Sequence, residues 1–324
     1  MKKYLLMVSV LLLMGIFSGG VDSSQAPQNK QSVATAAQAV PDVQKKQSEA
    51  SNKPEQIAQK KETKPVGQNL TTTAQRRRNA VIANESFSNI QINDPTIPIY
   101  DKLTVAERQE KGLGMVLPPL VHYEKEKVAY LTFDDGPETK NTPAVLDILK
   151  ENNIKATFYL VGSYVAAYPE VVKRIYAEGH AIGNHSYSHV YDDIYASPEA
   201  LLAELEQTDE QIKAVIGVRP FILRAPGGSM GQLDDNFWAA LEQAGYVEHD
   251  WNVSIADAAP GNPTAEDFIQ NIINQIADGK QTAVILMHSS GGHEETVRAL
   301  PEIIRILREC GYKFGVVSPL TPDV

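Results

Sequence analysis

Cysteine is almost absent from the sequence. Cys310 is the single cysteine among 324 residues, so the chain can form no internal disulfide and no zinc or iron–sulfur site built from several cysteines. Basic residues are scarce in the second part of the chain, where residues 128–324 hold 28 Asp and Glu against 13 Lys and Arg. An acidic surface repels nucleic acid and other polyanions. We therefore expect no nucleic-acid partner, and a neutral or cationic substrate.

The sequence also lacks an apolar run long enough for a typical membrane span. The N-terminal run covers residues 4–17, whereas a spanning helix needs about 20 residues. Two lysines precede this run and small residues follow it at 18–20, which is the order found in a secretory signal peptide. We assign residues 1–20 to a signal peptide and expect export to the cell envelope or the extracellular space. If uncleaved, this segment would tether the chain transiently to a membrane.

Aromatic residues are nearly missing from residues 21–89, which are rich in Gln, Ala, Lys, Ser, Thr and Pro. Such a segment cannot bury enough apolar surface to offset the entropy of ordering the chain. We therefore predict a disordered linker over residues 21–89. A lead-in segment over residues 90–127 has apolar patches and is expected to pack on the domain that follows it.

From residue 128 onward, short apolar runs alternate with amphipathic helical stretches. Such alternation predicts parallel strands joined by helical crossovers. Residues 128–318 are too few for a regular eight-unit barrel of about 250 residues, so we predict an α/β fold with a distorted or incomplete (β/α) barrel of about seven parallel strands. An open doubly wound sheet is the alternative, although no glycine-rich phosphate loop follows the first run. The predicted strands are 128–133, 155–162, 180–185, 219–226, 246–253, 282–288 and 312–317.

Titratable residues follow five of these predicted strands. Because the C-terminal ends of parallel strands meet on one rim, these residues are expected to lie together. They are Asp134 and Asp135, His185 and His189, Arg224, Asp257, and His288.

The rim residues predict a metal site with a base and an acid beside it. His185 and His189 are four residues apart, so on a helical turn both imidazoles would face one ion. With one carboxylate they leave an open coordination position, as catalytic sites do. One of the two adjacent aspartates would bind the metal and the other would act as a base, aimed by Arg224. His288 would be the acid. Each assignment also has a purely structural alternative. The two aspartates could belong to a simple Asp-Gly-Pro turn, Arg224 could form a surface ion pair, and His288 could be a histidine of the hydrophobic core.

Five motifs, taken in this order, resemble those of the polysaccharide deacetylase (NodB-homology, carbohydrate esterase 4) family: TFDDGP, H-S-x-x-H, R-A-P-G-G, D-W-N-V…D and L-M-H. The resemblance covers about residues 120–318. It implies a distorted barrel, one divalent metal, usually zinc, and hydrolysis of N-acetyl groups on peptidoglycan or a chitin-like glycan. The same ligand types also accept Co²⁺, Mn²⁺, Fe²⁺ or Ni²⁺.

The resemblance also implies roles for individual residues. Asp134 matches the general base, and Asp135, His185 and His189 match the metal ligands. His288 matches the general acid that Asp257 orients, and Arg224 matches the arginine that tunes the base. Gly227 falls at the oxyanion-hole amide, Leu286 at the acetate pocket, and Trp251 at a substrate position.

Two positions depart from the family pattern. Gly227 stands where a tyrosine is common, and Ala258 stands where a tryptophan forms the wall of the groove. Two aromatic walls are therefore missing, and a wider groove would suit a bulkier or branched glycan.

The expected partner is an N-acetylated glycan. The alternatives are an esterase that removes O-acetyl groups, as from acetylated xylan, and a glycan-binding homologue that has lost activity. Cleavage of another carbon–nitrogen bond also stays open, because fold and motifs do not determine the substrate.

Overall fold

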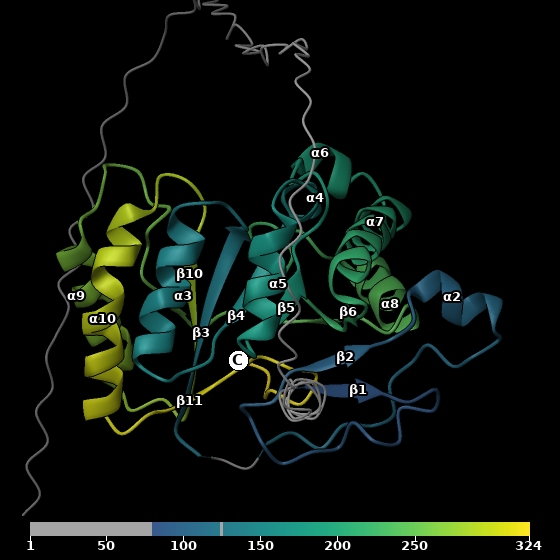
Figure 1. Ribbon diagram of the computed structural model, residues 1–324, viewed down its shortest axis with the longest axis horizontal. Helices are drawn as coiled ribbons and strands as arrows, with labels where there is room; N and C mark the ends of the chain where they lie inside the picture. Colours follow the sequence, from purple (N-terminus) through teal and green to yellow (C-terminus); the bar gives the residue numbers. More distant parts are fainter. Residues whose placement is uncertain (1–79, 124–125) are drawn as a thin grey trace, which may run out of the picture. The chain divides into compact units, whose positions relative to one another are not determined.

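The structure is a computed structural model that describes residues 80–123 and 126–324 (Figure 1). The predicted signal peptide and most of the predicted linker lie outside the described residues. Among the residues that are described, no helix combines the length and the apolar character needed to cross a membrane.

The larger sheet is curled, and its strands are parallel wherever they pair. Seven strands follow the order β8-β7-β5-β4-β3-β10-β9, and β11 pairs with the start of β3. The predicted barrel is confirmed. It is incomplete because no pairing in the described part of the chain joins β8 to β9. The strands are β3 (Val128–Gly136), β4 (Thr157–Leu160), β5 (Ala181–Asn184), β7 (Ile222–Leu223), β8 (Val247–Glu248), β9 (Val253–Ser254), β10 (Thr282–His288) and β11 (Lys313–Gly315).

Helices cover the outside of the curled sheet (Figure 1). The longest of them begins where the sequence has helix-start signals: Ser197 accepts a hydrogen bond from the Ala200 amide, and Pro198 occupies the first helical position. It ends at Gly217, whose φ of +82° is left-handed. The helices are α3 (Asn141–Glu151), α4 (Gly162–Ala167), α5 (Pro169–Ala177), α6 (Tyr191–Ile194), α7 (Pro198–Ile216), α8 (Asp235–Gln243), α9 (Ala265–Ile276) and α10 (Glu294–Glu309).

The two central strands, β3 and β10, alternate between two environments. Their odd-numbered residues join the main hydrophobic core, which they share with the helices. Their even-numbered residues face the inside of the curl, where Tyr130 and Val284 belong to a separate apolar cluster. Side chains alternate along a strand, so the polar residues near the strand ends continue this inward face. These inward neighbours are Thr132 with Leu286 and Asp134 with His288.

Two of the predicted strands are each divided in the structure. Residues 219–226 form β6 (Arg219–Pro220), which belongs to a second sheet, and then β7. Residues 246–253 were expected to form one strand, but β8 pairs with β7 while β9 pairs with β10, at the opposite end of the strand order. One straight strand cannot pair with both edges of an open curl. Residues 249–252 therefore cross between the two edges.

The described fold extends beyond both predicted domain boundaries. Residues 80–89, assigned above to the linker, contain β1 (Val81–Ala83) and the buried Phe87. β1 pairs with β2 (Ile99–Asp101), which pairs with β6. At the other end Leu320 is fully buried and packs in the same cluster as Phe87. Residues 80–89 are therefore ordered by packing against the lead-in segment, although their composition alone predicted disorder.

A buried network of charges joins the lead-in to the barrel. Asp101 of β2 accepts a 2.5 Å hydrogen bond from Arg108 Nε, and Arg108 lies on α2 (Val105–Glu110). The same carboxylate lies 3.4 Å from Arg219 Nη2, and Arg219 also faces Asp209 of α7 at 3.5 Å. All four side chains are buried.

We expect Asp101→Asn to lower the free energy of unfolding by about 3–5 kcal/mol, because it leaves the buried Arg108 guanidinium without a balancing charge and leaves Arg219 with Asp209 alone. Denaturant unfolding of the purified chain measures this. Glu170→Gln is the matched control: it removes one partner of an exposed ion pair with Lys173 and should cost less than about 1 kcal/mol. Equal effects of the two substitutions would contradict the prediction.

Candidate active site

Two adjacent carboxylates end β3 and point to different partners. Asp134 continues the inward face of the strand and is buried. Asp135 has a left-handed φ of +66°, and the pairing of β3 with β4 shifts register between Phe133 and Gly136. Such an irregularity re-aims a side chain that strand alternation would direct toward the helices. Asp135 consequently also reaches the rim.

Two imidazoles converge on Asp135. Its Oδ1 lies 3.3 Å from His185 Nε2 and 3.2 Å from His189 Nε2. His185 Nδ1 is 2.8 Å from the carbonyl oxygen of Arg224, which leaves its other ring nitrogen facing Asp135. The predicted helical turn is wrong. The two histidines lie in a loop after β5, where Ser186 (φ +62°) and His189 (φ +57°) turn through the left-handed region.

This group fits a divalent cation. Three donor atoms, one each from Asp135, His185 and His189, lie within 4.8 Å of one another. Two ligands at about 2.0–2.1 Å from a shared tetrahedral ion stand roughly 3.3 Å apart, which matches the measured separations from Asp135. Moreover, Asp135 Oδ1 is buried and has no hydrogen-bond partner among the described residues. Burial would raise the pKa of Asp135, but His185 and His189 hold it well below its usual range.

Arg224 connects this group to the interior of the barrel. Its side chain is fully buried, and Nη1 donates to Asp134 Oδ1 at 3.0 Å and to Thr132 Oγ1 at 2.6 Å. Nε and Nη2 donate to the carbonyl oxygens of His249 and Asp250, in the crossing segment between β8 and β9. The guanidinium thus holds Asp134 in one orientation.

His288 and Asp257 form a second polar unit on the rim. His288 ends β10 opposite Asp134, and its Nδ1 lies 2.8 Å from Asp257 Oδ1. Asp257 Oδ2 accepts hydrogen bonds from the His288 amide at 2.8 Å and from Thr296 Oγ1 at 2.7 Å. Burial lowers the pKa of His288, but the hydrogen bond and charge of Asp257 outweigh it and raise the pKa to about 9. The imidazole is therefore cationic at neutral pH.

His293 lies beside this pair. Its ring stacks on that of His288 at 5.0 Å between centroids, and with Asp257 the two histidines form another group of candidate metal ligands. The direct 2.8 Å contact between His288 and Asp257 leaves no space for an ion between those two atoms. We therefore interpret this group as a hydrogen-bonded acid pair. A cavity of about 290 Å³ adjoins it, near the Ala258 position, and is lined by Asp257, Ala259, His293 and Thr296 among others.

The three predicted substrate positions differ in their surroundings. Gly227, with φ +80°, lies against the Tyr191 side chain. Leu286 is on the inward face of β10, two residues before His288, and is only 9% exposed. Trp251 is half-buried, and the centroid of its ring lies 5.5 Å from the guanidinium carbon of Arg224. Trp251 therefore contacts a residue that holds Asp134.

Three residues of the site were missed by sequence reasoning. Glu204 of α7 accepts hydrogen bonds from the amides of Tyr187 and Ser188 and so holds the histidine loop. Thr296 binds Asp257, and Tyr191 packs beside His189. Glu204 and Thr296 are on helices distant in sequence from the groups they contact, so no local pattern marks them. Tyr191 could have been noticed as an aromatic residue two positions after His189.

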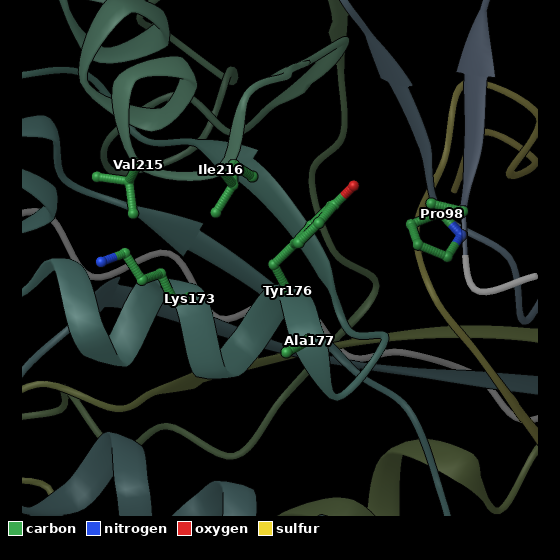
Figure 2. Close-up of a pocket in the computed structure, with 7 residues that line it drawn as sticks. Pro98, Lys173, Tyr176, Ala177, Val215 and Ile216 are labelled. Atoms are coloured by element: carbon green, nitrogen blue, oxygen red, sulfur yellow. The ribbon is translucent and has the colours of Figure 1, made fainter. Parts of the chain in front are cut away.

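Another cavity has a volume of about 290 Å³ and is lined by Ala80, Pro98, Lys173, Tyr176, Ala177, Val215 and Ile216. Figure 2 labels six of these residues. Most of these residues lie at the C-terminal ends of α5 and α7, shortly before β5 and β6 begin. The cavity is therefore at the opposite end of the sheet from the rim, and none of the described residues that line it carries a carboxylate or an imidazole.

Comparison with known proteins finds relatives in sequence and in structure. A sequence model of a family described as polysaccharide deacetylase matches residues 122–249. A peptidoglycan-N-acetylglucosamine deacetylase from Bacillus cereus is 35% identical over 213 residues, which cover 64% of this chain and 76% of that protein. The peptidoglycan-N-acetylmuramic acid deacetylase PdaA from Bacillus subtilis is 31% identical, covering 60% of this chain and 72% of that protein. The solved structure of the polysaccharide deacetylase Bc1974 from Bacillus cereus is 35% identical, with a TM-score of 0.56 over 60% of this chain and 93% of that one.

The raised pKa of His288 depends on Asp257. Asp257→Asn should lower this pKa from about 9 toward the ordinary histidine value of about 6.5, because burial remains after the carboxylate charge is lost and only the charges of Asp134 and Asp135 still raise the pKa. An NMR titration of the metal-free chain measures it. Thr296→Val is the control, since it removes a neutral hydrogen bond and keeps the carboxylate. A pKa that stays near 9 in Asp257→Asn would contradict the assignment.

Proposed function

Because the chain belongs to the polysaccharide deacetylase family, we propose that it is a metal-dependent hydrolase that removes N-acetyl groups from the amino sugars of peptidoglycan. One observation carries the mechanism. The adjacent carboxylates of β3 have different partners, with two imidazoles around Asp135 and a buried guanidinium on Asp134. With these partners, Asp135 is suited to bind a cation and Asp134 is suited to accept a proton.

We propose that Asp135, His185 and His189 would hold one divalent cation. We take this cation to be Zn²⁺, the ion that the family resemblance implies, and imidazole nitrogen and carboxylate oxygen are ligands that suit it. When bound, such a cation polarises a carbonyl group and makes a nearby water more acidic.

Asp134 acts as the general base. It accepts a proton from water as the water oxygen attacks the carbonyl carbon of the acetamido group. Arg224 directs one carboxylate oxygen inward through its 3.0 Å hydrogen bond, so the other oxygen is available to the proton. The Gly227 amide donates to the oxygen on which negative charge develops.

His288 acts as the general acid. Asp257 raises the pKa of this imidazole, which favours the protonated form that an acid needs, and His288 gives a proton to the sugar nitrogen as the carbon–nitrogen bond breaks. Asp257 orients the imidazole through Nδ1, which leaves Nε2 to deliver the proton. The water oxygen becomes one oxygen of the acetate, one proton is added to the amide nitrogen, and the second water proton is released when the acetic acid ionises, so the products are acetate and an amino sugar.

Peptidoglycan as substrate is supported by the relatives, two of which are named for its two amino sugars. Both sugars carry the acetamido group that this mechanism needs. A cell-wall substrate places the site of action in the envelope or outside the cell, in agreement with the expected signal peptide.

The two aspartates should respond differently to loss of charge. Asp134→Asn should keep bound metal and lower the rate of acetate release at least ~100-fold, the low end for loss of a general base. Asp135→Asn should lose metal as well as activity, because it removes a ligand charge. Elemental analysis and an acetate assay measure both effects. Near-normal turnover by Asp134→Asn would refute its role as the base.

The substrate and metal dependence can be tested together. Incubation with peptidoglycan should release acetate, and a chelator should abolish this release until Zn²⁺ is added back. Mass spectrometry of the digested wall then identifies which sugar has lost its acetyl group. Faster release from acetylated xylan would indicate an O-acetyl esterase. Glycan binding without acetate release would indicate an inactive homologue.

A further inference from the structure

Tyr191 lies at the entrance to the metal-ligand group. It begins α6, two residues after His189, and its ring meets the His189 ring edge-on at 5.7 Å between centroids. The Tyr191 hydroxyl and ring edge also reach across to the loop after β7: a Cβ atom added to Gly227 would stand 2.7 Å from the Tyr191 hydroxyl oxygen. The ring thus spans the space between a metal-ligand histidine and the proposed oxyanion amide.

The Tyr191 ring is supported by a neighbouring ring and is partly exposed. Tyr195 packs against it at 6.0 Å with an interplanar angle of 66°, and the Tyr195 hydroxyl is anchored to the carbonyl oxygen of Pro226 at 2.7 Å. Tyr191 itself is 43% exposed. Among the described residues its hydroxyl makes no hydrogen bond. An aromatic ring that is partly exposed and is supported by two neighbouring rings is a pre-organised surface for an apolar ligand face.

The position of Gly227 complements this arrangement. Any side chain at residue 227 would collide with Tyr191, and the φ of +80° would be strained for most other residues. The family pattern commonly has a tyrosine at this position. In this chain an aromatic ring reaches the same place from α6 instead, so an aromatic side chain lies where the sequence suggested that one was missing.

We propose that Tyr191 is a specificity-determining residue whose exposed ring packs against the pyranose ring of the amino sugar being deacetylated. This inference rests on the proposed function. An acetamido group that lies between the metal ligands and the Gly227 amide brings its own sugar ring to the face of Tyr191. The C–H face of a pyranose is apolar, and aromatic side chains that line a ligand site bind such faces.

Tyr191→Ala and Tyr191→Leu should each raise KM for the glycan that the wild-type chain hydrolyses by roughly 10-fold, with kcat within about 3-fold. Leucine keeps the bulk beside His189 but lacks a flat face. Tyr191→Phe keeps the ring and should stay within about 2-fold of wild type in both constants. Calorimetry with a soluble N-acetylglucosamine oligomer, in the Asp134→Asn background, should show a similar roughly 10-fold loss of affinity for Tyr191→Ala.

Bound metal and the midpoint of thermal unfolding are measured for each variant, so a disrupted loop is recognised. Trp238→Ala is the matched control: Trp238 on α8 is 41% exposed, and its ring makes no aromatic contact in the described part of the chain. It should leave KM unchanged.

The outcomes separate this inference from the proposed function. No acetate release by the wild-type chain would refute the proposed function. An active wild type with an unchanged KM in Tyr191→Ala would overturn the inference alone. A large fall in kcat for Tyr191→Phe would also overturn it, because the hydroxyl and not the ring would then be the important group.

Discussion

The buried guanidinium of Arg224 lies where the parts of the site meet. Its nitrogens bind Asp134 and Thr132 on β3 and two carbonyl oxygens in the segment that crosses from β8 to β9. Its own carbonyl oxygen fixes the His185 ring. A charge taken out of water is stable only when it is paired and fully hydrogen-bonded, so none of these partners can be lost without a large penalty. This requirement ties the strand that carries the carboxylates to the loop that carries the imidazoles.

The rest of the rim is arranged around that fixed point. Strand alternation puts Asp134 and His288 on the inside of the curl, opposite each other on paired strands. A left-handed residue brings Asp135 to the histidines, and Asp257 holds His288 as a cation. Groups that differ in charge and in proton affinity therefore lie around one small space. Only the two aspartates among them are adjacent in sequence. Beside that space the Tyr191 ring approaches Gly227 from α6.

The sequence was most informative where a local pattern reflects a local cause. Apolar runs of strand length between amphipathic stretches predicted the incomplete parallel barrel, and the polar residues at the ends of those runs predicted the composition of the rim. Prediction failed where the outcome depended on distant packing. Residues 80–89 looked like linker, yet Phe87 is buried against Phe221 at 5.5 Å between ring centroids. Residues 246–253 looked like one strand, yet β8 and β9 pair at opposite ends of the strand order. The signal peptide of residues 1–20 and the disordered linker up to residue 79 stay predictions.

The sequence by itself determined which chemical groups are present and which strand ends carry them, because side-chain identity and hydrophobic period are local properties. The three-dimensional structure decided how those groups face one another. The histidine spacing suggested a helix, but left-handed turns and the distant Glu204 set the loop that brings the imidazoles together. The sequence showed that an aromatic was missing at Gly227, and only packing showed that Tyr191 stands there. Contacts between elements far apart in the chain are set by the simultaneous packing of the whole core, and no short stretch of sequence contains that information.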